Sequence, residues 1–233
     1  MLKLDTVLIT GGSSLLATNW AKLIRDEYQV ILVLHKRIIK IEGCKTITAD
    51  LSCEQSIRNL IKQTKCDLII HTAALTDIEH CEKFPNEAVS VNVDITTNIS
   101  KACERSDVKL VHISTDQLFS GERSFISENE IPSALNVYGK TKQLAEEGVK
   151  NSGCNSLIIR TNFYGWGPSY RNSFSDWIIS SLREEKKITL FEDVFYTPIL
   201  IDTLVEIVHE LLNAEKTGIF NVVGNDRISK YQF

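Results

Sequence analysis

Short apolar segments alternate with helical patterns along most of this chain. The apolar segments are rich in Val, Ile, Leu and Thr, as expected for strands buried on both faces of a sheet. Alternation of this kind is typical of βαβ units, so the sequence predicts an α/β fold with a doubly wound parallel sheet. We expect strands at residues 6–10, 29–34, 45–49, 67–71, 109–113 and 155–160.

The helices expected among these strands cover residues 15–26, 52–65, 85–106 and 133–151. After Arg160 the sequence becomes richer in aromatic residues and turns. There we expect a helix at 172–185, a strand at 188–190, a helix at 201–215 and a strand at 218–223. The pattern predicts a main domain at residues 1–165 and a smaller lobe at 166–233 that closes over a cleft. An alternative is that part of this lobe packs back on the main sheet.

Composition argues against several classes of protein. The 233 residues are 43% hydrophobic and 24% charged, which is ordinary for a soluble globular protein. The net charge of -4 argues against a general nucleic-acid or anionic-membrane binder, and no apolar run is long enough to span a bilayer. The first residues lack the architecture of a signal peptide, and the six cysteines include no CxxC pair. We therefore expect a cytoplasmic protein with reduced thiols and no metal site, whose partners include neither nucleic acid nor membrane.

Tyr138 and Lys142 lie four residues apart in a segment with helical pattern, so both side chains leave the same face of the expected helix. A free tyrosine has a pKa near ~10, and a neighbouring ammonium favours its ionised form. The pair therefore predicts a tyrosine that exchanges protons near neutral pH. The alternative is an amphipathic surface helix that carries Tyr and Lys without a catalytic role.

A glycine turn, Gly11-Gly12-Ser13-Ser14, joins the first expected strand to a helix that begins at Leu15. This context suits a dinucleotide, because backbone amides at a helix N-terminus face the pyrophosphate and glycine allows close approach. A purely structural turn is the alternative, since many α/β proteins have a glycine pair in this position.

Three basic or potentially basic residues, His35, Lys36 and Arg37, follow the second expected strand, with no acid among them. An acidic residue there would bind the ribose 2′-hydroxyl of NAD, whereas an arginine accommodates the 2′-phosphate of NADP. The trio favours NADP(H) over NAD(H) as cofactor. A solvated basic loop is the alternative.

Further motifs give the chain a resemblance to a known family. The quoted residues are His71-Thr72-Ala73-Ala74, the run from Val111 to Gly121 (VHISTDQLFSG), Val137-Tyr138-Gly139-Lys140-Thr141-Lys142, and Ile159-Arg160-Thr161 followed by Tyr164-Gly165. Together with the glycine turn, their order and spacing resemble the extended short-chain dehydrogenase/reductase family, most closely its dTDP-4-dehydrorhamnose reductases. The likeness covers nearly the whole chain and implies a Rossmann fold with a C-terminal substrate lobe.

The resemblance also implies roles for individual residues. Tyr138 would be the catalytic acid, Lys142 would lower its pKa and hold the nicotinamide ribose, and Thr115 would bind the substrate carbonyl. The remaining cofactor contacts would come from Gly11, Gly12, Ser13, Ser14, Leu15, His35, Lys36, Arg37, Asp50, Leu51, Ala73 and Ala74. The other residues expected at the substrate are Thr76, Ser114, Asn162 and Trp166.

The function that the resemblance implies is reduction of the 4-keto group of a nucleotide-activated deoxysugar by NADPH. The first alternative is a nucleotide-sugar epimerase or dehydratase, although Asp116-Gln117 stands where dehydratases usually have an Asp-Glu pair. The second is a non-catalytic subunit similar to the regulatory β subunit of methionine adenosyltransferase. The assembly state is left open, with a homodimer as one possibility.

Two departures from the family pattern bear on these alternatives. Ser14 and Ala17 replace glycines of the family's GxxGxxG turn, and the Ser14 side chain is expected either to crowd the pyrophosphate or to bond one of its phosphates. The chain ends at Phe233, inside a segment that in the family begins a further part of the substrate lobe. The lobe is therefore expected to be truncated or reduced.

Overall fold

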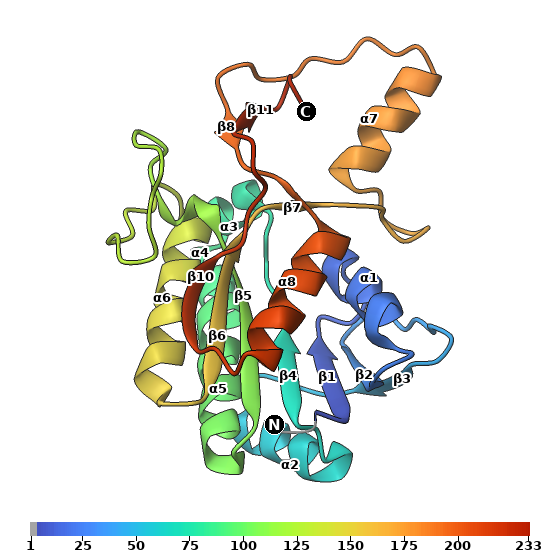
Figure 1. The fold of residues 1–233 in the computed structure, drawn as a ribbon, viewed down its shortest axis with the longest axis vertical. Coiled ribbons are helices and arrows are strands. Elements are labelled where there is room, and N and C mark those ends of the chain that lie inside the picture. Colours follow the sequence, from blue (N-terminus) through green and yellow to red (C-terminus); the bar gives the residue numbers. More distant parts are fainter. Residues whose placement is uncertain (1–3) are drawn as a thin grey trace.

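A seven-stranded sheet forms the centre of the computed structural model, which describes residues 4–233 (Figure 1). All of its neighbouring strands run parallel, in the order β10-β6-β5-β4-β1-β2-β3. The strands are β1 (Thr6–Thr10), β2 (Gln29–Leu34), β3 (Lys45–Thr48), β4 (Leu68–His71), β5 (Lys109–Thr115), β6 (Ser156–Thr161) and β10 (Gly218–Asn221). The predicted doubly wound α/β fold is confirmed.

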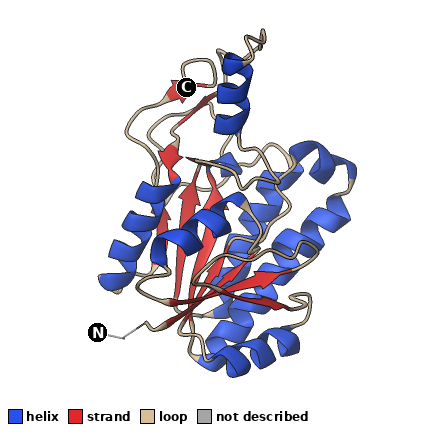
Figure 2. Ribbon diagram, turned by 90° about the vertical axis from the view of Figure 1, so that its right-hand side faces the viewer, coloured by secondary structure: helices blue, strands red, loops and turns tan. Residues whose placement is uncertain are grey.

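Helices cover both faces of this sheet (Figure 2). On one face α1 packs against α8, and on the other α2, α5 and α6 pack side by side. The helices are α1 (Leu15–Ile24), α2 (Glu54–Thr64), α3 (Ile78–Lys83), α4 (Pro85–Val89), α5 (Ile95–Ser106), α6 (Val137–Ser152), α7 (Phe174–Arg183) and α8 (Ile201–Asn213). A π-helical segment, Ser90–Asp94, joins α4 to α5, and a 3-10 turn, Asp116–Leu118, follows β5.

The alternation of side chains along β1 explains why both faces of the sheet need helices. Val7 and Ile9 belong to the core beneath α1 and α8, whereas Leu8 belongs to the core beneath α2 and α5. All three are fully buried. A strand whose successive residues are all apolar is therefore stable only between two layers of helix.

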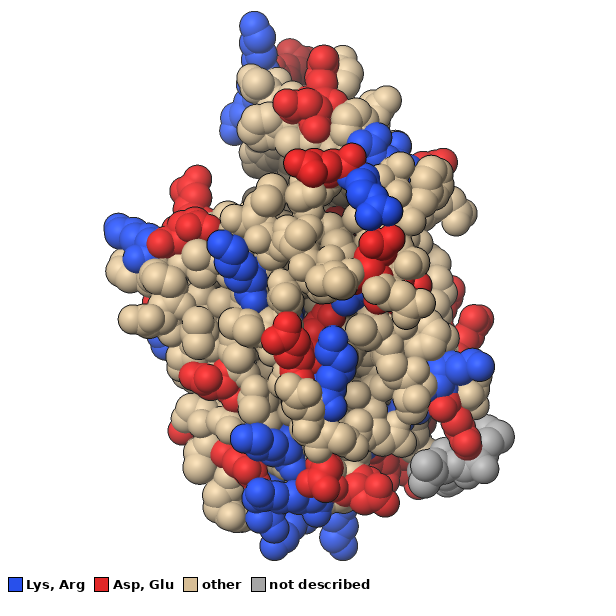
Figure 3. All heavy atoms as spheres, turned by 90° about the vertical axis from the view of Figure 1, so that its left-hand side faces the viewer, with Lys and Arg blue, Asp and Glu red and all other residues tan. Residues whose placement is uncertain are grey.

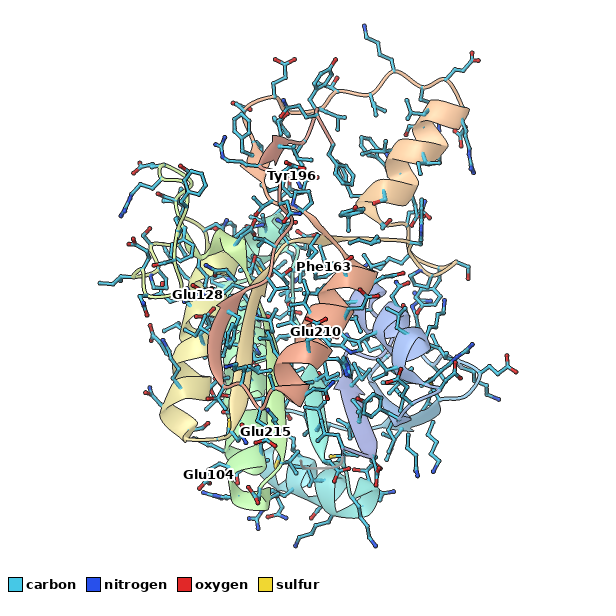
Figure 4. All side chains as sticks on the ribbon, in the orientation of Figure 1. Glu104, Glu128, Phe163, Tyr196, Glu210 and Glu215 are labelled. Carbon is cyan, nitrogen blue, oxygen red and sulfur yellow. The ribbon has the colours of Figure 1, made fainter. Side chains whose placement is uncertain are left out.

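A small lobe stands above the carboxyl end of the sheet (Figure 1). It contains α7 and the antiparallel pair β8 (Phe195–Tyr196) and β11 (Ile228–Ser229). The short parallel pair β7 (Phe163–Tyr164) and β9 (Ile199–Leu200) connects the lobe to the sheet. Tyr196, labelled in Figure 4, belongs to a group of aromatic side chains around Phe233. The chain then returns through α8 to β10, which pairs with β6 of the main sheet.

Most of the predicted elements are present with ends shifted by a few residues, and three differences are larger. The expected strand at 188–190 is wrong: Ile188 and Leu190 are partly buried and Thr189 is exposed, but the segment has no regular structure and pairs with no strand among the described residues. The helix expected from residue 133 begins at Val137, because the Asn136 side chain caps it. The helix expected at 85–106 is interrupted by the π-helical segment.

Acidic and basic side chains are interspersed over the face shown in Figure 3. In the part of the chain that the structure describes, no helix has both the length and the apolar character needed to cross a bilayer. All six cysteines are free thiols.

Candidate active site

The carboxyl ends of the central strands bring together residues that are distant in sequence. Gly11 follows β1, Ala73 follows β4 and Thr115 ends β5, and these strands are neighbours in the order β5-β4-β1. Gly11 and Ala73 touch, because a Cβ added to Gly11 would lie only 2.8 Å from the Cα of Ala73. Ligands of doubly wound sheets bind outside this edge. We therefore take it as the candidate active site.

The turn between β1 and α1 depends on both of its glycines. Gly11 has a φ of +64°, a conformation that favours glycine, and a Cβ at Gly12 would lie 2.8 Å from the Cβ of Leu32 in β2. The turn leads directly into α1, whose first amides, beginning with that of Leu15, have no acceptor within the helix. Such amides, at the positive end of a helix dipole, suit a phosphate group.

Ser14 is the N-cap of α1. Its hydroxyl accepts a hydrogen bond from the amide of Ala17 at 3.2 Å and lies 3.3 Å from the hydroxyl of Thr72. Thr72 donates its own proton to the carbonyl of Thr10 at 2.8 Å, so Ser14 is the donor within the hydroxyl pair. The serine that replaces a family glycine thus holds the first turn of the helix, and its one proton is already engaged.

His35, Lys36 and Arg37 follow β2 and are exposed. An acid lies closer to them than the sequence suggested, because Asp50 at the end of β3 is near His35. The pKa of Asp50 is lowered chiefly by hydrogen bonds with Ser52, and His35 adds to this effect. The ends of β2 and β3 therefore present a mixed surface of basic side chains and one carboxylate.

Two other residues predicted to contact the cofactor, and one predicted to contact the substrate, lie along the same end of the sheet. Leu51 is partly buried and packs on the core beneath α2 and α5, and Ala74 is partly buried after β4. Thr76 is exposed, one residue before the N-cap of α3.

Tyr138 lies in the first turn of α6 and is buried beside Thr115. Burial raises the pKa of Tyr138 to about 12, although its hydrogen bond with Thr115 lowers it. The phenol is therefore protonated at neutral pH. A buried, neutral phenol at the end of β5 is placed to donate a proton rather than to accept one.

Lys142 lies one helical turn beyond Tyr138 and is also buried. Its Nζ donates to the carbonyl of Ile113 at 2.7 Å and lies 3.1 Å from Nε2 of His112. Burial lowers the pKa of Lys142 to about 7, an effect that Glu146 opposes. The expectation that Lys142 lowers the pKa of Tyr138 is wrong in this structure, because the amine is held against β5 and burial dominates the phenol.

Ser114 and Thr115 point to different partners. The Ser114 hydroxyl donates to Oε1 of Glu146 at 2.6 Å, and Glu146 forms a buried ion pair with Arg160 at 2.8 Å. The Thr115 hydroxyl, in contrast, donates to Oδ1 of Asp116 at 3.3 Å and accepts from the amide of Gln117 at 3.2 Å, and it lies close enough to Tyr138 to lower the pKa of the phenol. The structure thus brings Thr115 to the acid and uses Ser114 to join β5 to α6.

Comparison with known proteins places the chain in a family. A model of the RmlD substrate binding domain matches residues 5–233. The chain belongs to this family. The resemblance to dTDP-4-dehydrorhamnose reductases is confirmed.

Three relatives illustrate the similarity. A probable low-salt glycan biosynthesis reductase of Haloferax volcanii is 27% identical over 97% of this chain and 76% of its own length. The crystal structure of a hypothetical dTDP-4-dehydrorhamnose reductase from Sulfolobus tokodaii has a TM-score of 0.83 and 32% identity, covering 97% of this chain and 79% of its own. The dTDP-4-dehydrorhamnose reductase of Bacillus anthracis, in complex with NADP, has a TM-score of 0.86 and 25% identity, covering 99% and 78%.

A carboxylate of this RmlD-family chain, that of Asp116, lies near the candidate acid Tyr138. Asp116 follows Thr115, and its Oδ2 accepts a hydrogen bond from Nδ2 of Asn162 at 2.9 Å. Burial raises the pKa of Asp116, although Asn162, Thr115 and Lys230 lower it. Nζ of Lys230 lies 3.3 Å from the centre of the Tyr196 ring in the lobe. Lys230 therefore lies near both Asp116 at the end of β5 and Tyr196 in the lobe.

Trp166 lies in the loop between β7 and α7 and is 59% exposed. It borders an open hollow of about 580 Å³ whose lining also includes Asp176 and Arg183. The described residues that line this hollow do not include Tyr138. Trp166 thus belongs to the lobe side of the site, and Asn162 to the side of the acid.

The sequence analysis did not identify two buried polar residues, Glu146 and Asn92, that hydrogen-bond residues next to the site. Glu146 lies four residues after Lys142, a spacing on one helix face that could have drawn attention to it. Asn92, in the π-helical segment, accepts from the amide of Leu75 at 2.7 Å and donates to Thr141 at 3.0 Å. Such segments are frequent at functional sites. Among residues 4–233, no group of three or more His, Cys, Asp or Glu side chains could hold a metal ion.

The lowered pKa of Lys142 predicts a specific pH dependence of stability. Between about pH 7 and 10.5, the unfolded chain keeps a proton on Lys142 that the folded protein has released. The free energy of unfolding should therefore rise with pH in this window, by up to about 1.4 kcal/mol per pH unit from this group. Lys142→Met lacks the group, so the parent should gain stability relative to the variant as pH rises. Urea unfolding of both proteins at pH 7, 8 and 9 measures this, and a constant difference would contradict it.

Proposed function

We propose that this protein reduces the 4-keto group of a nucleotide-activated deoxysugar. The observation that carries the proposal is the buried, protonated Tyr138 beside Thr115 at the carboxyl end of β5. A ketone that gains a hydride at carbon also needs a proton at oxygen, and Tyr138 holds that proton. A nicotinamide dinucleotide supplies the hydride when bound.

Each residue of the site has a task in this reaction. Tyr138 donates its hydroxyl proton to the carbonyl oxygen as negative charge develops there. Thr115 hydrogen-bonds the same oxygen and keeps it beside the phenol. Lys142, one helical turn beyond Tyr138, holds the nicotinamide ribose. Asp116 and Asn162 orient the sugar next to Thr115.

The residues present fit a nicotinamide dinucleotide. The amide-rich start of α1, reached through Gly11 and Gly12, suits the pyrophosphate. The relatives include a reductase in complex with NADP and an enzyme of the same fold in complex with NAD. For this chain we favour NADP(H), because the exposed His35, Lys36 and Arg37 suit a 2′-phosphate.

The alternatives are less well supported. Asp116 is followed by Gln117, which lacks the second carboxylate expected of a dehydratase. A purely regulatory subunit has no need of a buried phenol joined to Thr115, and the altered glycine turn has a structural explanation in the Ser14 cap.

The six free cysteines agree with a reducing compartment such as the cytoplasm.

The activity is tested by following NADPH oxidation with a panel of 4-keto nucleotide sugars that differ in base and sugar. We expect oxidation to require a 4-keto substrate and to stop when the ketone is consumed. Binding of these compounds without oxidation of NADPH or NADH would instead favour the non-catalytic alternative.

The cofactor preference makes a separate prediction. NADPH should bind more tightly than NADH, and Arg37→Ala should narrow the gap by about 1.5–3 kcal/mol, the usual contribution of a hydrogen bond to a charged group. Calorimetric titration at one salt concentration measures both affinities. Arg123→Ala is the matched control, because Arg123 is an exposed arginine on a distant loop and should leave the ratio unchanged. Equal affinities in the parent would refute the preference.

A further inference from the structure

Arg37 does not stand alone at the end of β2. Its guanidinium carbon lies 4.6 Å from the centre of the Tyr170 ring, a distance at which cation and ring attract each other. Tyr170 comes from the loop between β7 and α7, 133 residues later in the chain. A residue of the substrate side of the molecule thus contacts the arginine expected at the cofactor.

Tyr170 is itself fixed to the glycine turn. Its hydroxyl donates to the carbonyl of Ser13 at 3.0 Å, and the ring is partly buried. The start of the same loop is tied to α1, because Nδ2 of Asn19 donates to the carbonyl of Trp166 at 2.9 Å. The ring therefore occupies a defined place between the turn that suits a pyrophosphate and the arginine after β2.

The loop that carries Tyr170 is ordered by its own contacts. The amide of Gly167 donates to Asp176 at 2.7 Å, and Asp176 also completes a capping box with Ser173 at the start of α7. A Cβ at Gly167 would meet the carbonyl of Arg171, so the loop needs glycine there. A loop held at both ends presents the ring to Arg37 in a fixed position.

A ring contact of this kind holds the guanidinium of an arginine in an orientation that suits a phosphate. A guanidinium that rests on an aromatic face keeps the N–H groups of its edge free, and those groups match phosphate oxygens in pairs. An exposed arginine otherwise loses much side-chain freedom when it binds, and holding it in advance reduces that loss. The hydroxyl bond to Ser13 fixes the ring relative to the expected pyrophosphate.

We propose that Tyr170 is a positioning residue for recognition of a phosphate monoester at the end of β2, acting by holding the Arg37 guanidinium beside the glycine turn. This inference rests on the proposed function, since the ligand it serves is the 2′-phosphate of NADP(H). Tyr170 would thus be a determinant of cofactor choice in the loop between β7 and α7, in addition to the residues at the end of β2.

The test compares Tyr170→Leu with the parent by calorimetric titration of NADPH and NADH under one salt condition. A cation–π contact at an exposed site contributes about 0.5–1 kcal/mol, so the affinity ratio of NADPH to NADH should fall on the order of 2- to 5-fold. General damage to the fold would weaken both cofactors equally and leave the ratio unchanged. Tyr170→Phe keeps the ring and should keep most of the ratio.

Tyr231→Leu is the matched control, because Tyr231 is an exposed tyrosine of the lobe, and it should leave the ratio at the parental value. A parent that prefers NADPH and a Tyr170→Leu variant with the same ratio would overturn the role of Tyr170 and leave the proposed function intact. A parent that binds both cofactors equally would overturn this inference and the NADP preference together, while keto reduction with either cofactor would stand.

Discussion

Tyr138→Phe is expected to reduce turnover by about 10²- to 10⁴-fold, the usual contribution of a positioned acid. The substitution removes one oxygen and keeps the ring that packs against the buried Cys81 and Ala88. The fold and the affinity for cofactor should therefore stay close to those of the parent. Steady-state kinetics with a substrate that the parent reduces, together with cofactor titration, measure both quantities.

Tyr28→Phe is the matched control for this substitution. Tyr28 packs against His209 at the far end of α1 and has no place in the proposed chemistry. The Tyr28→Phe variant should therefore retain the turnover of the parent. If Tyr138→Phe also retained parental turnover, another group would have to supply the proton and the proposed mechanism would be wrong.

Arg160→Met is expected to lower the free energy of unfolding by about 3–5 kcal/mol. Arg160 is 3% exposed, and its guanidinium binds both oxygens of Glu146, a residue that is 1% exposed. Within residues 4–233, removing the arginine leaves the buried carboxylate with the Ser114 hydroxyl as its one remaining hydrogen-bond partner. Urea unfolding, analysed at one pH, gives the difference from the parent.

The pair Arg105 and Glu54 supplies the control. It is also an arginine–glutamate pair, 2.6 Å apart, but the Arg105 side chain is 53% exposed. Arg105→Met should therefore cost at most about 1 kcal/mol. The double variant Glu146→Leu with Arg160→Met should recover much of the lost stability, since no charge is left unpaired. If Arg160→Met lowered the free energy of unfolding no more than Arg105→Met does, the buried pair would not stabilise the fold as proposed.

The sequence predicted the fold because the signals of a parallel sheet are local. Strands such as β1, β2 and β4 are short apolar runs, and the turn at Gly11 and Gly12 marks the first strand end. The expected strand at 188–190 failed for the opposite reason. A strand exists only with a neighbour, and local β preference does not say whether one is in reach.

The placement of the candidate site residues was predictable where it depends on position along a strand or helix, and not where it depends on contacts between elements. The spacing of Tyr138 and Lys142 identified a shared helix face, but it could not show that the lysine would bind His112 and Ile113 on β5. Neither could it show that burial would raise the pKa of the phenol. The contact between Tyr170 and Arg37 likewise joins two loops that no sequence pattern relates.

One measurement tests the central claim most directly. The protein is incubated with a 4-keto nucleotide sugar and NADPH that carries deuterium at the transferable position, and the product is analysed by mass spectrometry and proton NMR. The proposed function predicts one deuterium on carbon 4 of the sugar, with one product formed for each NADPH consumed. An unreduced sugar, or a sugar rearranged without deuterium at carbon 4, would contradict it.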